Sequence, residues 1–265
     1  MGLSEQEISD NYQKLIDIIE TYISSERKKK LIELYEQIAD RVATAPASSI
    51  NTFHGCYPGG YVNHVLGVVD FSIKLYNLWK ENGADVEDYQ LENLVFCAIN
   101  HDLGKVGDME NDYYIPNTSD WHVKNQGRVY VDNPSLINMS VPDRSIWMLQ
   151  NAGITISQNE FMAIKLHDGP YVDENKGYFS AFQEHRQIRS NMVFILHYAD
   201  YMACRIEYEK ERNNRGSQTG SITKPKNQNT NNKLSESTAS KNASDLFAKM
   251  FEKKDWGMIW LMYML

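Results

Sequence analysis

Apolar residues recur every three or four positions along most of the chain, the spacing that places them on one face of an α-helix. The first such run opens with Ser4 and Glu7, whose separation is that of a capping box. It continues through six apolar positions at helical spacing: Ile8, Tyr12, Leu15, Ile19, Tyr22 and Ile23. The pattern predicts a helix that begins near Ser4 and packs one face against a core.

The same spacing predicts five further helices, over residues 29–42, 61–79, 91–101, 160–166 and 189–209. A strand is suggested only at residues 128–131, inside an irregular stretch, 107–143, that contains three prolines. There is no internal repeat. We therefore predict an all-α fold, a helical bundle with an irregular insertion after the helix at 91–101.

The C-terminal part of the sequence has a different composition. Residues 213–243 lack aromatic side chains and are rich in Asn, Ser, Thr, Gln and Lys, which predicts a disordered linker. Residues 244–265 carry an amphipathic stripe, which suits either a helix folded back on the body or a segment that docks on a protein partner. The expected organisation is N-terminal helices at 1–50, the main domain at 51–212, the linker, and this C-terminal segment.

The net charge of −8 is unevenly distributed. From Arg212 to Lys241 six Lys and Arg residues accompany one acid, Glu236, so this segment carries +5 and the rest of the chain −13. An acidic body repels long polyanions. The charge favours a nucleotide or other small phosphate substrate over a duplex, and leaves single-stranded nucleic acid open.

Three cysteines form no CxxC pair, which fits a reducing compartment and argues against a structural zinc site. The N-terminal residues MGLSEQEISD are polar and acidic, unlike a secretory signal. The most apolar stretch, Trp256–Leu265, is about half the ~20 residues that a membrane span needs. We expect a soluble, cytoplasmic protein without a membrane partner.

The candidate chemistry centres on adjacent His101 and Asp102, which follow an apolar helix. Together with His64 and Asp200 they offer imidazole and carboxylate ligands, which suit Mn, Fe, Zn or Ni and suit Mg less well. Alone, His64 would more often be a hydrogen-bonded core histidine than a ligand, whereas a buried Asp200 needs a partner or a metal. The combination predicts one divalent metal held between three helices.

These residues lie in motifs that resemble a known superfamily. Residues 59–64 read Gly-Gly-Tyr-Val-Asn-His, residues 101–105 read His-Asp-Leu-Gly-Lys, and Asp200 follows late in the chain. This H…HD…D pattern, over residues 57–205, resembles the HD-superfamily metal-dependent phosphohydrolases, and its Gly-Gly start is most similar to the subgroup found in 3′-to-5′ exoribonucleases.

The resemblance implies an all-α fold and a divalent metal, Mn, Mg, Fe, Ni or Zn, bound by His64, His101, Asp102 and Asp200. It also implies hydrolysis of a phosphoester or phosphoanhydride bond, commonly in nucleotides, cyclic dinucleotides or RNA 3′ ends. The phosphodiesterase activity of the exoribonuclease subgroup is the alternative within this class.

His167 lies in the segment 159–169, which is similar to the E-x-x-x-I-x-x-H helix of superfamily members that bind two metals. His167 is therefore a candidate ligand of a second metal, with His122 as a substitute for the histidine that Ser135 replaces. A fuller ligand set would permit a di-iron oxygenase, and Ser135 argues against it. Alternatively, His167 is a catalytic or phosphate-binding residue.

Lys105 lies where the superfamily places a lysine that contacts the substrate phosphate. As a mechanistic hypothesis, the ion activates a water molecule, Lys105 stabilises the developing charge, and Asp102 or Asp168 accepts the proton. The predicted catalytic residues are accordingly Asp102, Lys105 and His167.

Four further residues have less defined expected roles. Arg205, five residues after Asp200, is a candidate for substrate binding. His197 could orient a metal ligand or pack in the core, and we expect His54 and His185 at the surface. A protein-interaction module with a vestigial metal site, docking through residues 244–265, stays open as a function of another class.

Overall fold

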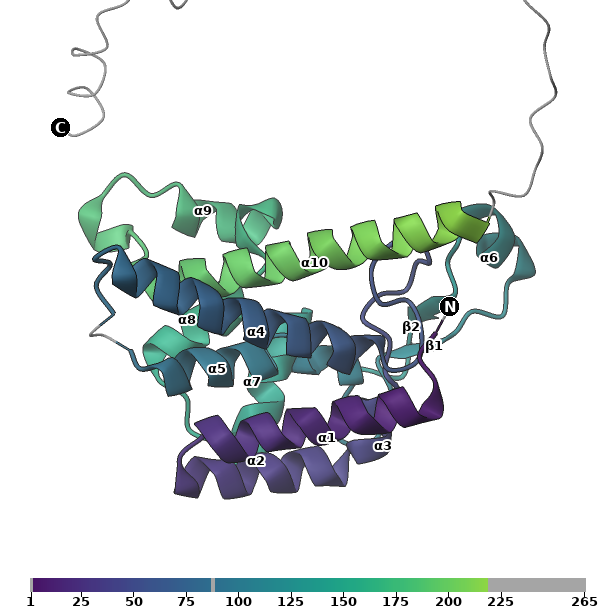
Figure 1. The fold of residues 1–265 in the computed structure, drawn as a ribbon, viewed down its shortest axis with the longest axis horizontal. Coiled ribbons are helices and arrows are strands. Elements are labelled where there is room, and N and C mark those ends of the chain that lie inside the picture. Colours follow the sequence, from purple (N-terminus) through teal and green to yellow (C-terminus); the bar gives the residue numbers. More distant parts are fainter. Residues whose placement is uncertain (1, 87–88, 219–265) are drawn as a thin grey trace, which may run out of the picture. The chain divides into compact units, whose positions relative to one another are not determined.

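The computed structural model describes residues 2–86 and 89–218 and confirms the all-α fold (Figure 1). The α-helices of this part are α1 (Glu5–Tyr22), α2 (Ser25–Gln37), α3 (Ala39–Thr44), α4 (Gly60–Glu81), α5 (Leu91–Asn100), α6 (Asp120–Gln126), α7 (Val141–Asn151), α8 (Gln158–Leu166), α9 (Lys176–Phe179) and α10 (Asn191–Gln218). Short 3-10 helices are η1 (Leu103–Val106), η2 (Gly169–Tyr171), η3 (Asp173–Asn175) and η4 (Glu184–Arg186).

The first helix, α1, begins as its sequence predicts. The Ser4 hydroxyl accepts a hydrogen bond from the Glu7 amide at 3.3 Å, and the Glu7 carboxylate accepts one from the Ser4 amide at 2.8 Å. This reciprocal capping box satisfies two amides that the helix itself leaves without a partner. The apolar face of α1 then buries Leu15 and Ile19 completely.

Residues 29–42, predicted as one helix, form two, because Ile38 leaves the helical conformation at φ −117° and ψ 22°. At this break the Tyr12 hydroxyl of α1 donates a hydrogen bond to the carbonyl of Tyr35, at 3.2 Å. Neither glycine nor proline marks the position. The break accompanies a contact between distant segments, which local periodicity does not encode.

The stretch predicted as irregular, 107–143, contains α6 and the start of α7. The α7 helix begins after Ser140, whose hydroxyl accepts a hydrogen bond from the Asp143 amide at 3.2 Å. Pro142 lies in its first turn, a position where proline is tolerated because no intrahelical amide is needed. Helix α7 was missed, although its cap and its first-turn proline are both visible in the sequence.

The strand suggested at 128–131 is present, but it begins two residues later and ends one residue later. Strand β2 (Tyr130–Asp132) pairs antiparallel with β1 (Tyr114–Pro116), and Ile115 lies opposite Val131. These two strands make the single sheet of the described residues. The sequence of this short run therefore indicated which segment pairs, but not the residues at which the strand begins and ends.

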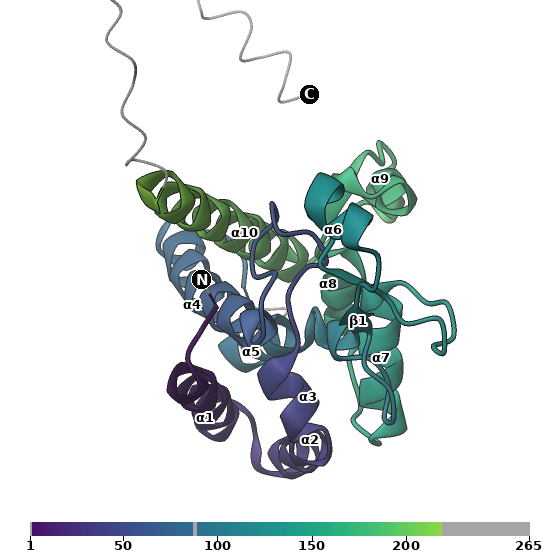
Figure 2. The same cartoon turned by 90° about the vertical axis from the view of Figure 1, so that its right-hand side faces the viewer.

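Helix α5 lies at the centre of the packing. Six of its ten residues are apolar and fully buried: Leu94, Val95, Phe96, Cys97, Ala98 and Ile99. A helix that is apolar on all sides must be surrounded, and α5 indeed contacts α1, α4, α8 and α10. In both views α4 lies between α10 and α1 (Figures 1 and 2). His101 follows at the C-terminal end of this central helix.

Helix α10 is longer than the predicted helix at 189–209. It runs to Gln218, beyond residue 213, where the sequence predicts a linker to begin. The rest of the predicted linker and the C-terminal segment at 244–265 lie outside the described residues. None of the described helices is long and apolar enough to cross a membrane.

Candidate metal centre

Two glycines set the start of α4, the helix that carries His64. Gly59 has φ +84°, a conformation that side chains disfavour. A Cβ atom on Gly60 would overlap the backbone of Gly55. The Gly-Gly pair therefore lets the preceding loop approach the end of α4, and His64 follows one turn into the helix.

Four predicted ligands converge from α4, the end of α5, and α10. His64 Nε2 lies 3.1 Å from Asp200 Oδ1 and 3.7 Å from Asp102 Oδ2. His101 Nε2 lies 3.4 Å from Asp102 Oδ2 and 3.9 Å from Asp200 Oδ1. Two ligands bound at about 2.1 Å to one ion lie at most about 4 Å apart. His64, His101 and Asp200 form a group whose potential ligand atoms all lie within 4.8 Å of one another, and Asp102 Oδ2 lies beside both histidines. The spacing fits three ligands of one ion, with Asp102 next to them.

The other ring nitrogen of each histidine is fixed by a hydrogen bond. His101 Nδ1 donates to the Ala98 carbonyl at 2.8 Å, and His167 Nδ1 donates to the Ile164 carbonyl at 2.8 Å. His64 Nδ1 bonds to the carboxylate of Glu207 at 3.1 Å. Metal-binding histidines almost always use the second nitrogen in this way. The arrangement turns each Nε2 toward the centre.

Among the described residues, the Nε2 atoms of His64 and His101 are buried and have no hydrogen-bond partner. The 3.1 Å approach of His64 Nε2 to Asp200 lacks the direction of a hydrogen bond. Buried polar atoms without partners cost free energy and are rare. A divalent cation would satisfy both nitrogens at once, so the side chains present fit a metal ion.

The electrostatics of the site favour positive charge. Burial alone would lower the pKa of His64, but the carboxylates of Glu207 and Asp200 outweigh it and raise the pKa to about 10. Burial likewise opposes protonation of His167, yet Asp168 and Asp102 raise its pKa to about 9. Carboxylates that attract protons this strongly also attract a divalent cation.

Asp102 faces two directions at once. Its Oδ2 atom lies toward His64 and His101, whereas its Oδ1 atom lies 3.5 Å from His167 Nε2. Lys105 Nζ lies 2.6 Å from Oδ2, and its side chain is 17% exposed. Burial would raise the pKa of Asp102, but the charge of Lys105 holds it well below the usual range. Asp102 is therefore ionised and available as a ligand.

Two predicted site residues are not brought to the centre. His122 lies exposed on α6 and belongs to none of the groups of possible ligands that the described residues form. Arg205 lies exposed on α10, where its guanidinium is 3.6 Å from Glu209. The suggested substitution of His122 for the histidine replaced by Ser135 therefore does not occur in this structure.

The centre also contains three residues that were not predicted there: His54, Cys204 and Glu207. The expectation that His54 lies at the surface is wrong. The His54 ring lies 4.8 Å from the His64 ring, and its Nε2 atom lies 3.5 Å from Cys204 Sγ. Burial and the nearby positive groups lower the pKa of His54 to about 3, so it is neutral. Cys204 and Glu207 follow Asp200 at four and seven residues, the spacing of one helix face. This spacing is the feature of the sequence that could have indicated that Cys204 and Glu207 lie beside Asp200.

His197 holds the backbone next to the centre. Its Nδ1 atom donates a hydrogen bond to the His167 carbonyl at 2.8 Å. Gly169 has φ +65°, and a Cβ atom there would overlap the His197 ring. His197 therefore shows features of both expected roles. It makes a contact that positions the backbone of His167, and its side chain is buried.

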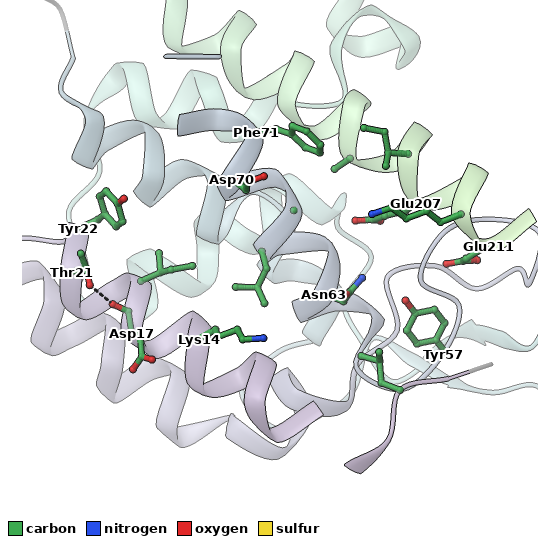
Figure 3. A pocket seen from close by; sticks show the side chains of 17 residues that line it. Lys14, Asp17, Thr21, Tyr22, Tyr57, Asn63, Asp70, Phe71, Glu207 and Glu211 are labelled. Atoms are coloured by element: carbon green, nitrogen blue, oxygen red, sulfur yellow. Dashed lines mark hydrogen bonds between the residues drawn. The ribbon is translucent and has the colours of Figure 1, made fainter. Parts of the chain in front are cut away.

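A cavity of about 860 Å³ lies between α1, α4 and α10 (Figure 3). Glu207 lines it and also bonds His64, so this carboxylate stands between the cavity and the centre. The charged side chains of the lining are Asp17, Asp70, Glu207, Glu211, Lys14 and Lys210. The lining therefore has more acidic than basic side chains, which does not suit an anion.

Comparison with known proteins does not assign this chain to a family. No protein-family model, curated protein or solved structure matches this chain. The resemblance to the HD superfamily stays a prediction from the sequence motifs, and function has to be inferred from the side chains of the centre.

Proposed function

We propose that this protein is a metal-dependent phosphohydrolase of the HD type. The observation that carries the proposal is the pair of buried imidazole Nε2 atoms of His64 and His101, which lack hydrogen-bond partners among the described residues and face two carboxylates. In the absence of a ligand such a cluster is costly. A bound cation would remove this cost, which supports a metal site.

His64, His101, Asp102 and Asp200 would hold the divalent ion. Nitrogen and oxygen ligands together favour Mn, Fe, Zn or Ni, with Mg less favoured. When bound, such an ion lowers the pKa of a bound water molecule and neutralises phosphate oxygens. The substrate class that needs both effects is a phosphoester or phosphoanhydride.

Lys105 and Asp168 complete the chemistry. Lys105 Nζ lies 2.6 Å from Asp102, so a phosphate beside that carboxylate is within its reach. The partly exposed Asp168 lies 3.7 Å from His167 Nε2, and its carboxylate can accept the proton of the attacking water. These residues bind the phosphate and remove the water proton, the two tasks that hydrolysis leaves to the protein.

The substrate is a nucleotide or a short nucleic acid. The acidic chain favours a small phosphate over a duplex, and a 3′-to-5′ exoribonuclease-like phosphodiesterase is the alternative within this class. We place the reaction in the cytoplasm, whose reducing conditions suit a chain with three cysteines and no CxxC pair.

The test is a substrate panel with the Mn-loaded protein: ribo- and deoxynucleotides, cyclic dinucleotides and a short labelled RNA. We expect phosphate or a phosphate-terminated product from one class, and no turnover by Asp102→Ala at saturating metal. Asp120→Ala, which removes an exposed carboxylate from α6, is the matched control. Turnover by Asp102→Ala equal to that of the wild type contradicts the proposal.

A second candidate function is a di-iron oxygenase. It is favoured by two further groups of possible ligands, His101 with Asp102 and His167, and His167 with Asp168 and Asp200. A second ion would use the Oδ1 side of Asp102. Two iron ions per chain together with substrate-dependent O₂ uptake would support this activity, and one ion with phosphate release would support the hydrolase.

A further inference from the structure

Two exposed tyrosines stack on each other near the candidate metal centre. Tyr171 belongs to η2 and Tyr201 to α10. Their ring centroids lie 5.8 Å apart and their planes differ by only 12°. Tyr171 is 72% exposed and Tyr201 46% exposed. A large aromatic surface is thus ordered by stacking yet left open to solvent, where it contributes little to the core.

The pair is connected to the His167 side of the centre through His197. Tyr201 directly follows Asp200, and Tyr171 comes three residues after Asp168. The Tyr171 ring also lies 6.0 Å from the ring of His197, whose Nδ1 atom bonds the His167 carbonyl. The tyrosines are therefore tied to the same backbone that carries the candidate site residues.

The local backbone holds Tyr171 in this place. Gly169 adopts φ +65°, which turns the chain directly after Asp168. The absence of a side chain on Gly169 lets the chain pass over the His197 ring. A surface fixed in this way before binding loses little conformational entropy when a ligand stacks on it.

Resting on the proposed function, we propose that the Tyr171–Tyr201 pair binds the base of a nucleotide substrate whose phosphate lies at the metal centre. A flat uncharged ring is the ligand that a stacked aromatic pair recognises, and every nucleobase offers one. The two ends of the substrate are bound by different chemistry, the phosphate by the ion and Lys105 and the base by stacking. The expected substrate is a nucleotide with little preference for the identity of the base.

The first experiment compares the nucleotide that is hydrolysed best in the substrate panel with the same sugar phosphate without its base, such as ribose 5-phosphate for a 5′-monophosphate, which has no aromatic ring. Tyr171→Ala and Tyr201→Ala should each lower the ratio of kcat/KM for the nucleotide to that for the base-free ester by about 10-fold. Tyr171→Phe should restore the ratio, because stacking needs the ring and not the hydroxyl. Phe182→Ala, which removes an aromatic side chain that is 98% exposed, is the control.

An unchanged ratio in both tyrosine variants overturns the base-binding inference and leaves the hydrolase proposal standing. If no substrate is turned over, a binding measurement tests the base-binding inference separately from the hydrolase proposal. The Mn-loaded protein should bind adenosine 5′-monophosphate about 10-fold more tightly than ribose 5-phosphate, and Tyr171→Ala should remove this difference. Equal affinities in the wild type overturn the inference whether or not hydrolysis is detected.

Discussion

Two buried polar clusters in this protein differ in how their hydrogen bonds are satisfied. In the first, the Glu160 cluster, the carboxylate of Glu160 is fully buried but accepts bonds from every side. Arg27 donates two, at 2.7 and 3.0 Å, Asn93 donates one at 2.8 Å, and the Ser157 amide donates one at 2.7 Å. This network joins α2, α5 and α8, and it stabilises their packing.

In the second, the candidate metal centre, the Nε2 atoms of His64 and His101 lie near carboxylates but have no hydrogen-bond partner among the described residues. The same types of polar group are present, but they are not arranged to satisfy one another. A satisfied buried cluster stabilises the fold, whereas an unsatisfied one is maintained at a cost in stability because it serves a ligand. Substitutions should therefore affect the two clusters in opposite ways.

The largest expected effect is on metal binding. Asp200→Asn removes a charged ligand, and the affinity for Mn²⁺ should fall by about 1000-fold. The free energy of unfolding of the metal-free protein should change by less than about 1 kcal/mol, because the carboxylates of Glu207 and Asp102 still lie beside His64 and balance its charge. Isothermal titration with Mn²⁺ and urea unfolding measure the two quantities. A large loss of metal-free stability would place Asp200 among the structural residues.

Glu160→Gln should show the reverse pattern. Without the carboxylate, Arg27 loses its buried partner and one donor faces the Gln amide, so the free energy of unfolding should fall by about 3 kcal/mol. The number of Mn²⁺ ions bound per folded protein should stay the same. Loss of metal by a folded Glu160→Gln protein would end the distinction between the two clusters.

Glu207 tests whether the outer contacts of the centre matter. Glu207→Ala removes the acceptor that fixes His64 Nδ1, and Mn²⁺ affinity should fall 10- to 100-fold, the usual effect of losing such a partner. Glu209→Ala, on the exposed face of the same helix, is the matched control. Equal affinities for the two variants would show that His64 needs no orientation by Glu207.

The smallest expected effect is on the free energy of unfolding at acidic pH. Burial would raise the pKa of Glu160, but its bonds from Arg27 and Asn93 lower it below the unfolded value of 4.5. The stabilisation by ionised Glu160 is therefore fully present above about pH 4.5 and is lost as the pH falls through the folded pKa. The stability difference between the wild type and Glu160→Gln should shrink below that pH. Urea unfolding at pH 7 and pH 3.5 checks this, and a constant difference contradicts it.

The comparison also shows how one motif can be read in two ways. Glu160 and His167 are the first and last residues of the E-x-x-x-I-x-x-H pattern. The structure places His167 at the centre and Glu160 in the structural cluster, bonded to Arg27. Seven residues of helix separate them, about two turns, so a shared helix did not imply a shared role.

The sequence by itself determined the helical class, most helix positions, and four side chains that the structure brings together: His64, His101, Asp102 and Asp200. It could do so because amphipathic periodicity and capping are local, and a polar pair at the end of an apolar helix is conspicuous in one dimension. The chemistry of each side chain was likewise fixed by its type.

Only the tertiary structure decided which helix faces meet. It placed His54 against His64, oriented Nδ1 of His64 on Glu207, and left Arg205 and His122 away from the centre. These outcomes depend on long-range packing, in which loops of different length bring residues together from distant positions. Periodicity identifies the buried face of a helix, but not the partner that buries it.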